Sequence, residues 1–167
     1  FLILAPFSHY YACEPDGDEA KRLPAKLKAD GPWRAITVFP EALSSNEGQA
    51  TLYITKQPGL SSLLQPNYAV VNTYYRGDEF RIDSTASVST ISLERAAERH
   101  GFSDACFLKL DTQGTELDIL QSGRKLLEES VLAIYVELEF HPFYQEQPLF
   151  SDVDSYLRGL NFSLFDL

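Results

Sequence analysis

The stretch FLKLDTQGTELDIL, residues 107–120, decides how the chain is interpreted. Its first four residues are mostly apolar, as in a buried strand, and Asp111 follows them directly. Gly114 then supplies a turn, and the residues after it have the apolar spacing of a helix. A strand that passes into a helix through a short acidic turn is half of a strand-helix-strand unit, and ligands of open α/β sheets collect at such strand ends. Asp111 is therefore the first candidate for a binding residue.

The composition limits the class of protein. The 167 residues are 44% hydrophobic and 13% aromatic, which predicts one globular domain over residues 1–167 with a sizeable core. Fourteen basic and 24 acidic residues give a formal charge of −10, which opposes binding to nucleic acid phosphates and to anionic membranes. The apolar start FLILAP is too short for a membrane span and lacks the features of a signal peptide. Cys13 and Cys106 lie in apolar runs, and so few cysteines favour buried, reduced thiols in a cytoplasmic protein.

Strand-like runs alternate with amphipathic segments along the chain. Strands are expected over residues 9–14, 34–40, 48–56, 107–110, 131–140 and 161–167, and helices over residues 17–30, 92–100, 115–123 and 151–159. Residues 57–89 are rich in turn-forming residues and give no clear assignment. The alternation predicts an α/β fold with a mostly parallel sheet and helices on both of its faces.

Glu14 ends the first predicted strand, immediately before a Pro-Asp-Gly turn. A carboxylate at this place can accept hydrogen bonds from both hydroxyls of a ribose. Each charge-assisted bond is worth about 1.5–3 kcal/mol, so a bidentate pair would favour nucleoside ligands. The alternative is that Glu14 only stabilises the start of the following helix. Asp111 lies at the corresponding place on a later strand, so one edge of the sheet is expected to carry both acids, although Asp111 can also cap its own helix.

Glu137 and Glu139 lie two residues apart in the predicted strand 131–140 and therefore point to one face. If that strand is buried, both carboxylates need hydrogen bonds or a cation. Asp111 and Glu116 could complete a magnesium-type oxygen site with them, but backbone donors can satisfy all four, and we expect no metal. His141 follows at the end of the strand, where an imidazole can move protons near neutral pH or simply pack at the surface.

Several segments, in order, resemble the FkbM-type methyltransferases. The similarity runs through EPD (14–16), EALSSNEGQATLYI (41–54) with GLSSL (59–63), TISLERAAERHG (90–101), FLKLDTQGTELDILQSG (107–123) and VELEFHPFYQEQPLF (136–150) with GLNFSLFDL (159–167). It covers nearly the whole chain. The resemblance implies a Rossmann-like class I fold that binds S-adenosylmethionine and methylates a hydroxyl oxygen.

The resemblance also implies roles for individual positions. Glu14 resembles the ribose-binding acid of the family, and Asp16 belongs to the same cofactor-binding EPD motif. Ala42 and Leu43 lie where the family's adenine-side loop follows its third strand. Asp111 resembles the acid beside the methyl-donor end of the cofactor.

Two features depart from the family's pattern. The strand and glycine-rich turn that hold the methionine part of the cofactor should precede residue 9, and they are not recognisable in FLILAPFS. We therefore expect a domain that is incomplete at its N-terminus. Gln113 stands where many relatives have a glutamate, so that carboxylate is missing here.

The leading prediction is an S-adenosylmethionine-dependent O-methyltransferase that acts on a hydroxyl of a small-molecule or carbohydrate acceptor. Asp111 or His141 is the candidate base that takes up the hydroxyl proton. One alternative is a non-catalytic or degenerate Rossmann-like binding module. A less favoured alternative is an NAD-dependent oxidoreductase, because an acid at the end of the second strand also binds the ribose of that cofactor. Neither the acceptor nor the oligomeric state can be derived from the sequence.

Overall fold

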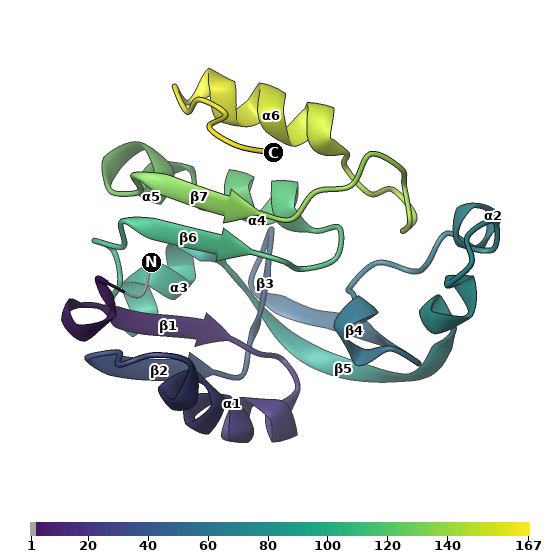
Figure 1. Ribbon diagram of the computed structural model, residues 1–167, viewed down its shortest axis with the longest axis horizontal. Helices are drawn as coiled ribbons and strands as arrows, with labels where there is room; N and C mark the ends of the chain where they lie inside the picture. The colour runs from purple at the N-terminus through teal and green to yellow at the C-terminus, as the bar shows by residue number, and fades with distance from the viewer. Residues whose placement is uncertain (1–2) are drawn as a thin grey trace.

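The computed structural model of the protein describes residues 3–167 as a mixed α/β fold (Figure 1). Its strands are β1 (His9–Cys13), β2 (Ala35–Phe39), β3 (Ala42–Ser44), β4 (Gly48–Thr55), β5 (Ile82–Ser92), β6 (Phe107–Leu110) and β7 (Ala133–Val136). Its α-helices are α1 (Gly17–Asp30), α2 (Tyr68–Val71), α3 (Leu93–His100), α4 (Glu116–Ser122), α5 (Arg124–Glu129) and α6 (Phe150–Gly159). Three 3-10 turns are η1 (Ala5–Phe7), η2 (Pro58–Leu60) and η3 (Gly77–Phe80).

Parallel pairing dominates the strands that carry the predicted site. β1 pairs with β2, and β6 pairs with β7, both in parallel. β3 and β5 are also parallel, whereas the long β4–β5 pair is antiparallel. In Figure 1 the arrows of β1, β2, β6 and β7 all point the same way, toward the sheet formed by β3, β5 and β4. The carboxyl ends of these four strands therefore share one edge of the molecule.

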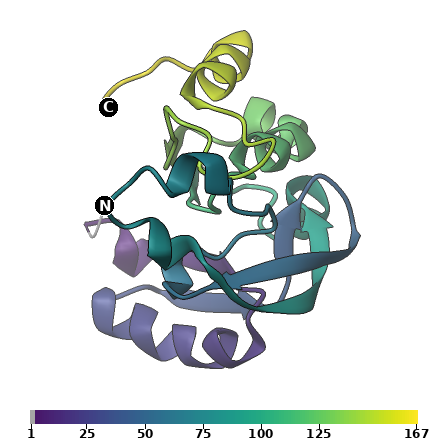
Figure 2. The same ribbon diagram turned by 90° about the vertical axis from the view of Figure 1, so that its right-hand side faces the viewer.

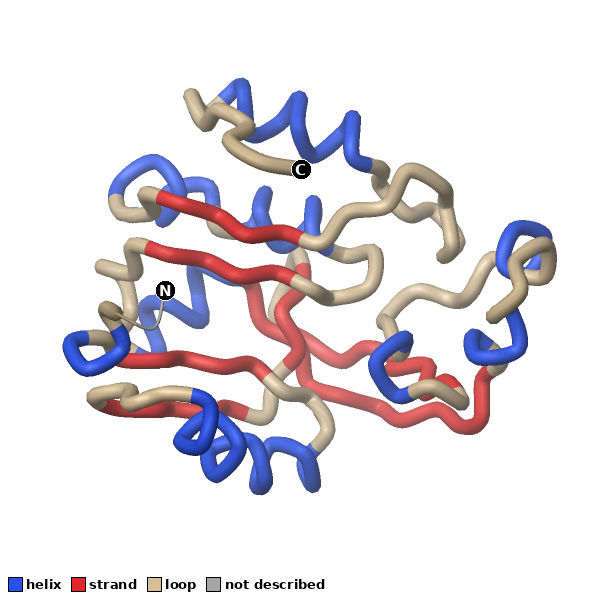
Figure 3. The backbone as a smooth tube through the Cα atoms, viewed as in Figure 1, coloured by secondary structure: helices blue, strands red, loops and turns tan. Residues whose placement is uncertain are grey.

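The two parallel pairs lie side by side without a ladder between them. Among residues 3–167, β1 pairs only with β2 and β6 only with β7. In Figure 3 the strands β7, β6, β1 and β2 follow one another across the molecule, with a wider space between β6 and β1. The β4–β5 pair extends away from them as a separate, twisted ribbon (Figure 3).

The main core lies between β6, β7 and helices α3 to α6. Its buried side chains come from the ends of β2, β5 and β6, from the apolar faces of the helices and from the loops after α3 and α5: Phe39, Ile91, Leu93, Ala96, Ala97, Phe102, Leu110, Ile119, Leu120, Leu126, Leu127, Val131 and Val153. A methyl group at Gly123 would lie 2.5 Å from Leu93 Cδ2, so a glycine is needed where α4 meets α3. Figure 2 shows α6 and α1 at opposite ends of the fold.

The capping residues of α3 behave as the sequence predicts. Ser92 Oγ accepts a hydrogen bond from Arg95 N at 3.3 Å, which satisfies one free amide of the first turn. Gly101 ends the helix with φ +75°, in the left-handed region that glycine adopts at little cost. The helix predicted over residues 92–100 is therefore confirmed.

Two sequence-based assignments are wrong or incomplete. No strand forms over residues 161–167, where Phe165 and Leu167 are exposed. The alternating pattern is present there, but none of the described strands pairs with it. Residues 57–89, left unassigned, contain most of β5 together with α2 and two 3-10 turns. The Ser- and Thr-rich β5 is a strand because it pairs along the whole length of β4.

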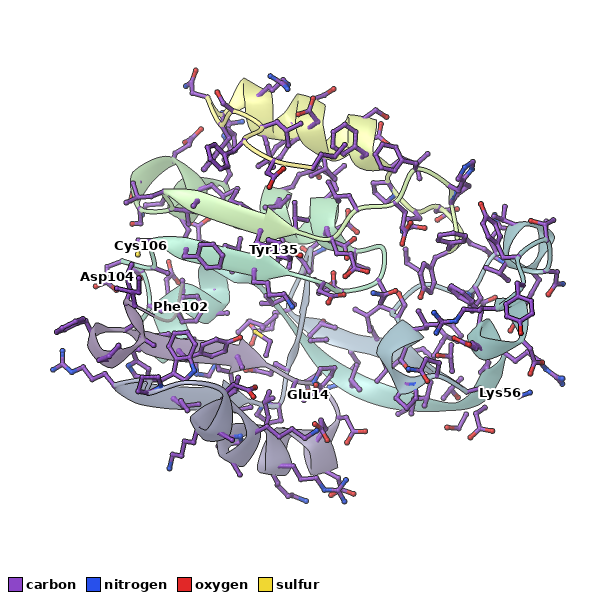
Figure 4. All side chains as sticks on the ribbon, viewed as in Figure 1. Glu14, Lys56, Phe102, Asp104, Cys106 and Tyr135 are labelled. Carbon is purple, nitrogen blue, oxygen red and sulfur yellow. The ribbon has the colours of Figure 1, made fainter. Side chains whose placement is uncertain are left out.

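The prediction of helices on both faces is not met over β7. Tyr135, in the middle of this strand, is 61% exposed (Figure 4). The last helix stays on the side of α4, where Tyr156 Oη donates to the backbone oxygen of Leu120 at 3.4 Å. Cys106 is also exposed, contrary to the expected burial, because it precedes β6 instead of lying within it. None of the helices described for residues 3–167 combines the length and the apolar sequence that a membrane span requires.

Candidate functional site

The carboxyl ends of the parallel strands bring the predicted acids to one edge. Glu14 follows β1 and Asp111 follows β6, and Figure 4 shows Glu14 at the end of its strand. Glu14 N donates to Phe39 O at 3.1 Å, and Glu137 N donates to Leu110 O at 2.9 Å. These bonds continue the parallel ladders by one residue beyond the strands. The backbone therefore fixes where each acid leaves its strand.

The Glu14 carboxylate is held by its own turn. Its Oε1 accepts a hydrogen bond from Asp16 N at 2.9 Å. The side chain is half-buried, and burial is the main cause that raises the pKa of Glu14 above its ordinary 4.5, partly offset by the bond from Asp16. Burial also raises the pKa of the neighbouring Cys13 thiol, and the charges of Glu41 and Glu14 raise it further, so this thiol stays protonated. Glu14 is thus an oriented acceptor at the position where the sequence predicts a ribose-binding acid.

Asp16, the second predicted cofactor-binding acid of this turn, is the N-cap of α1. Its Oδ1 accepts hydrogen bonds from Asp18 N at 2.9 Å and Glu19 N at 3.1 Å. This satisfies two of the free amides at the start of the helix. Asp16 therefore has a structural task in this turn, and a direct contact with a cofactor stays a prediction.

Ala42 and Leu43 lie at the start of β3, where Ala42 is buried and pairs with Thr90 of β5. The loop before them is anchored by Glu41, which is 17% exposed and accepts from Arg99 Nη1 at 2.9 Å and from His100 Nε2 at 3.0 Å. The His100 ring also stacks on Phe39, with ring centroids 4.0 Å apart. The last turn of α3 therefore fixes the backbone just before Ala42 and Leu43, the two residues predicted to lie on the adenine side of the cofactor.

Asp111 opens a tight turn whose shape depends on Gly114 and Glu116. Gly114 has φ +110°, and a methyl group there would lie 3.1 Å from Leu64 Cδ1. The buried Glu116 carboxylate accepts from Thr112 N at 2.8 Å and from Gly114 N at 3.0 Å. Thr112 Oγ1 adds a further bond at 3.0 Å. Because its oxygens bind the turn itself, Glu116 is a structural acid.

Asp111 itself is exposed at the surface of this turn. Its Oδ1 accepts a hydrogen bond from Gln113 Nε2 at 2.9 Å. Its Oδ2 lies 3.6 Å from Lys109 Nζ, an ion pair between two exposed groups that contributes little to stability. The carboxylate is thus accessible and oriented by one amide.

Glu137 and Glu139 are not the buried strand residues that the sequence predicts. β7 ends at Val136, so Glu137 is exposed and Glu139 is only partly buried. Partial burial still raises the pKa of both carboxyls, and the charge of Asp111 raises that of Glu137 further. Gln113 lies near Glu137 and lowers its pKa in part. The structure therefore brings Asp111 and Glu137 together at the ends of the adjacent strands β6 and β7.

His141, the second candidate base, is exposed in the loop after β7. Its ring meets the edge of Tyr74, with centroids 6.4 Å apart, and Tyr74 also packs on Phe143. Its positive form would lower the pKa of Glu139, which places the two side chains near each other. No contact between His141 and Asp111 is seen, so a shared role in proton transfer stays a prediction.

No group of three or more His, Cys, Asp or Glu side chains within residues 3–167 is placed to hold a metal ion. Glu116 is occupied by the turn, which removes one of the four acids that the sequence could have assigned to a cation.

Sequence reasoning missed the residues that fix the Asp111 turn from a distance. Ser62 Oγ donates to Gln113 O at 2.7 Å, and the buried Tyr144 Oη lies 3.1 Å from Gln113 Oε1 and 2.8 Å from Leu60 O. Gln113 itself has φ +58°, a conformation that costs energy for a residue other than glycine. No local pattern predicts these contacts, because they join segments 31 to 84 residues apart.

The fold and this edge define a class of protein. Parallel strands that end in acids, within an α/β domain, are typical of proteins that bind nucleoside-containing ligands. The sequence profile of the methyltransferase FkbM domain matches residues 4–164. The chain therefore belongs to the FkbM methyltransferase family, which confirms the resemblance inferred from its motifs. No curated protein and no solved structure matches the chain significantly.

Proposed function

We propose that this methyltransferase transfers a methyl group from S-adenosylmethionine to a hydroxyl oxygen of a small-molecule or carbohydrate acceptor. The observation that carries the proposal is the placement of Glu14 and Asp111 after parallel strands, on one edge of the fold. Family membership supports methyl transfer in general. The identity of the methyl donor and the chemical class of the acceptor are our proposal.

The residues of this edge suit such a donor. Glu14 would accept hydrogen bonds from the ribose hydroxyls, because its carboxylate is partly buried and already oriented by Asp16 N. Asp111 offers an exposed carboxylate, which suits the positive sulfonium of the donor. Ala42 and Leu43 would lie beside the adenine, because Glu41 anchors the backbone directly before them. When bound, the cofactor supplies an activated methyl group.

The task of the protein is then alignment and removal of one proton. With the cofactor bound, the acceptor oxygen would form its bond to the methyl carbon while the carbon–sulfur bond breaks and leaves its electron pair on sulfur. The hydroxyl proton must leave, and Asp111 or His141 is the base in our proposal. Both are exposed at the carboxyl side of β6 and β7, where an acceptor can approach.

We also propose that the two parallel pairs belong to one Rossmann-like sheet. The facing edges of β1 and β6 have no ladder between them, although both strands point the same way (Figure 1). A further parallel strand, followed by a glycine-rich turn, would join the pairs and bring the turn to the same edge as Glu14 and Asp111. A cytoplasmic location, expected from the few cysteines, belongs to this proposal as well.

Calorimetry with the full-length protein tests the proposed donor. S-Adenosylmethionine and S-adenosylhomocysteine should bind more tightly than NAD, and Glu14→Ala should weaken their binding by about 1.5–3 kcal/mol. Glu129→Ala, which removes an exposed acid of α5, serves as the control and should bind normally. Tighter binding of NAD would favour an oxidoreductase, and binding of none of the three would favour a degenerate module.

A further inference from the structure

The side-chain amide of Gln113 is surrounded by partners on both of its ends. Its Nε2 donates to Asp111 Oδ1 at 2.9 Å, and Gln113 also lies close enough to Glu137 to lower the pKa of that carboxyl. Its Oε1 lies 3.1 Å from the hydroxyl of Tyr144. An amide nitrogen carries two hydrogens, so one hydrogen is available for each carboxylate. The amide therefore bridges the two acids that follow β6 and β7.

Asp111 and Tyr144 together fix the orientation of this amide. Its side chain is almost fully buried, and burial, reinforced by the surrounding acids, raises the pKa of the phenol well above its usual range. The phenol therefore keeps its proton at neutral pH and shares it between Leu60 O at 2.8 Å and Gln113 Oε1 at 3.1 Å. The Asp111 carboxylate can only accept, so the amide of Gln113 turns its nitrogen toward Asp111 and its oxygen toward the phenol. This leaves the nitrogen of Gln113 for the carboxylates.

The backbone of Gln113 is fixed as well. Its φ of +58° is disfavoured for glutamine, yet Ser62 Oγ holds its carbonyl oxygen at 2.7 Å. Ser62 is buried and accepts in turn from Leu64 N at 3.0 Å. Strain of this kind persists where the surrounding contacts determine the conformation, and it is frequent at functional sites. The segment 59–64 thus holds Gln113 in place.

Asp111 and Glu137 leave neighbouring strands in register. Leu110 pairs with Val136, so the acids that follow them emerge side by side. Burial and the charge of the neighbouring Asp111 raise the pKa of Glu137, so Glu137 keeps its proton to a higher pH than an isolated glutamate does. The other charged or titratable groups near the pair are Lys109 beside Asp111, and Glu116, Glu139, His141 and Tyr144 on the surrounding segments.

We propose that Gln113 is a positioning residue that holds Asp111 and Glu137 as one carboxyl pair, whose negative charge faces the sulfonium of the methyl donor. The proposal rests on the proposed function for the identity of that donor. Only the donor, S-adenosylmethionine, carries the positive sulfur, and the product, S-adenosylhomocysteine, is neutral there. The ratio of their affinities therefore reports the charge that the pair presents.

The first experiment measures the affinities of both compounds by calorimetry between pH 4 and pH 8. In the wild type, the preference for S-adenosylmethionine should grow as the pH rises and the pair loses its proton. Gln113→Ala should reduce this preference about fivefold or more. It should also move the change in preference to a higher pH. S-Adenosylhomocysteine should still bind through Glu14. Tyr144→Phe should also reduce the preference for S-adenosylmethionine, but less than Gln113→Ala does. Gln121→Ala, an exposed glutamine of α4, is the matched control.

The second experiment needs no ligand. Carbon-13 NMR of the side-chain carboxyls should show that Asp111→Asn lowers the titration midpoint of Glu137 and that Gln113→Ala raises it by about half a pH unit or more. Unchanged midpoints in both variants would overturn the pair. The wild type could bind neither compound while the two substitutions still shift the Glu137 midpoint. That result would overturn the proposed function and the proposed task of the pair, but it would establish the pair itself. An affinity ratio in Gln113→Ala that matches the wild type at every pH would overturn the positioning role.

Discussion

The turn after β1 and the turn after β6 lie on the same edge, but they are held in different ways. Glu14 is oriented by Asp16, two residues away, and Asp16 in turn caps the helix that starts at Gly17. The Asp111 turn is held by Ser62 and Tyr144, which come from segments distant in sequence. The first turn is local, whereas the second depends on the assembled fold.

This difference indicates different mechanical properties. Local bonds between exposed groups can rearrange when a ligand arrives, because few other contacts depend on them. Buried bonds between distant segments break only when those segments separate. We therefore expect the Glu14 turn to adapt to a ligand and the Asp111 turn to be rigid before the ligand binds.

The largest expected contrast is between two glycines. Gly114→Ala should lower the free energy of unfolding by about 2–4 kcal/mol, because φ +110° is unfavourable for alanine and its methyl group would crowd Leu64. Gly17→Ala, at the start of α1, meets nothing within 4 Å and should be neutral or stabilise the protein by up to about 1 kcal/mol. Urea denaturation measures both. Similar effects of the two substitutions would remove the distinction between the turns.

A smaller contrast is expected between two acids replaced by their amides. Glu116→Gln should cost about 1.5–3 kcal/mol, since the buried carboxylate accepts from Thr112 N and Gly114 N and the new amide turns a donor toward donors. Asp16→Asn should cost less than about 0.5 kcal/mol, because asparagine caps helices as well as aspartate does. Thermal unfolding of both variants provides the comparison. A loss of stability below about 0.5 kcal/mol in Glu116→Gln would show that the hydrogen bonds of Glu116 do not determine the turn.

The smallest effect concerns the pH dependence of Glu14. Burial raises its native pKa above the ordinary 4.5, so the native state keeps this proton longer than the unfolded chain does. The contribution of Glu14 to stability is therefore highest below pH 4.5 and is lost as the pH rises through its native pKa. Glu14→Gln should become progressively more stable than the wild type over this interval and keep a constant advantage above it. Urea titrations from pH 4 to pH 8 test the sign, and a difference that is flat or reversed contradicts it.

The sequence predicts the elements whose signals are local. Ser92 and Gly101 mark the ends of α3, and the acids Glu14 and Asp111 mark the ends of β1 and β6. Each of these depends on a few consecutive residues, so propensity and spacing are enough.

The sequence does not predict features that arise from pairing between distant segments. β5 is polar and reads as a loop, and it becomes a strand only because β4 lies beside it. Residues 161–167 show the opposite case, since their alternation suggests a strand but none of the described strands pairs with them. Gln113 resembles β5 in this respect, because its position depends on Ser62 and Tyr144, and no sequence spacing connects these residues to it.

Hydrogen–deuterium exchange with and without S-adenosylhomocysteine tests the central claim, that one ligand joins both turns of this edge. The account predicts slower exchange in residues 14–19 and in residues 111–116, with the same dependence on ligand concentration, and a larger change in the first segment because it is the less rigid one. Protection confined to one of the two segments, or no protection at saturating ligand, would contradict the account.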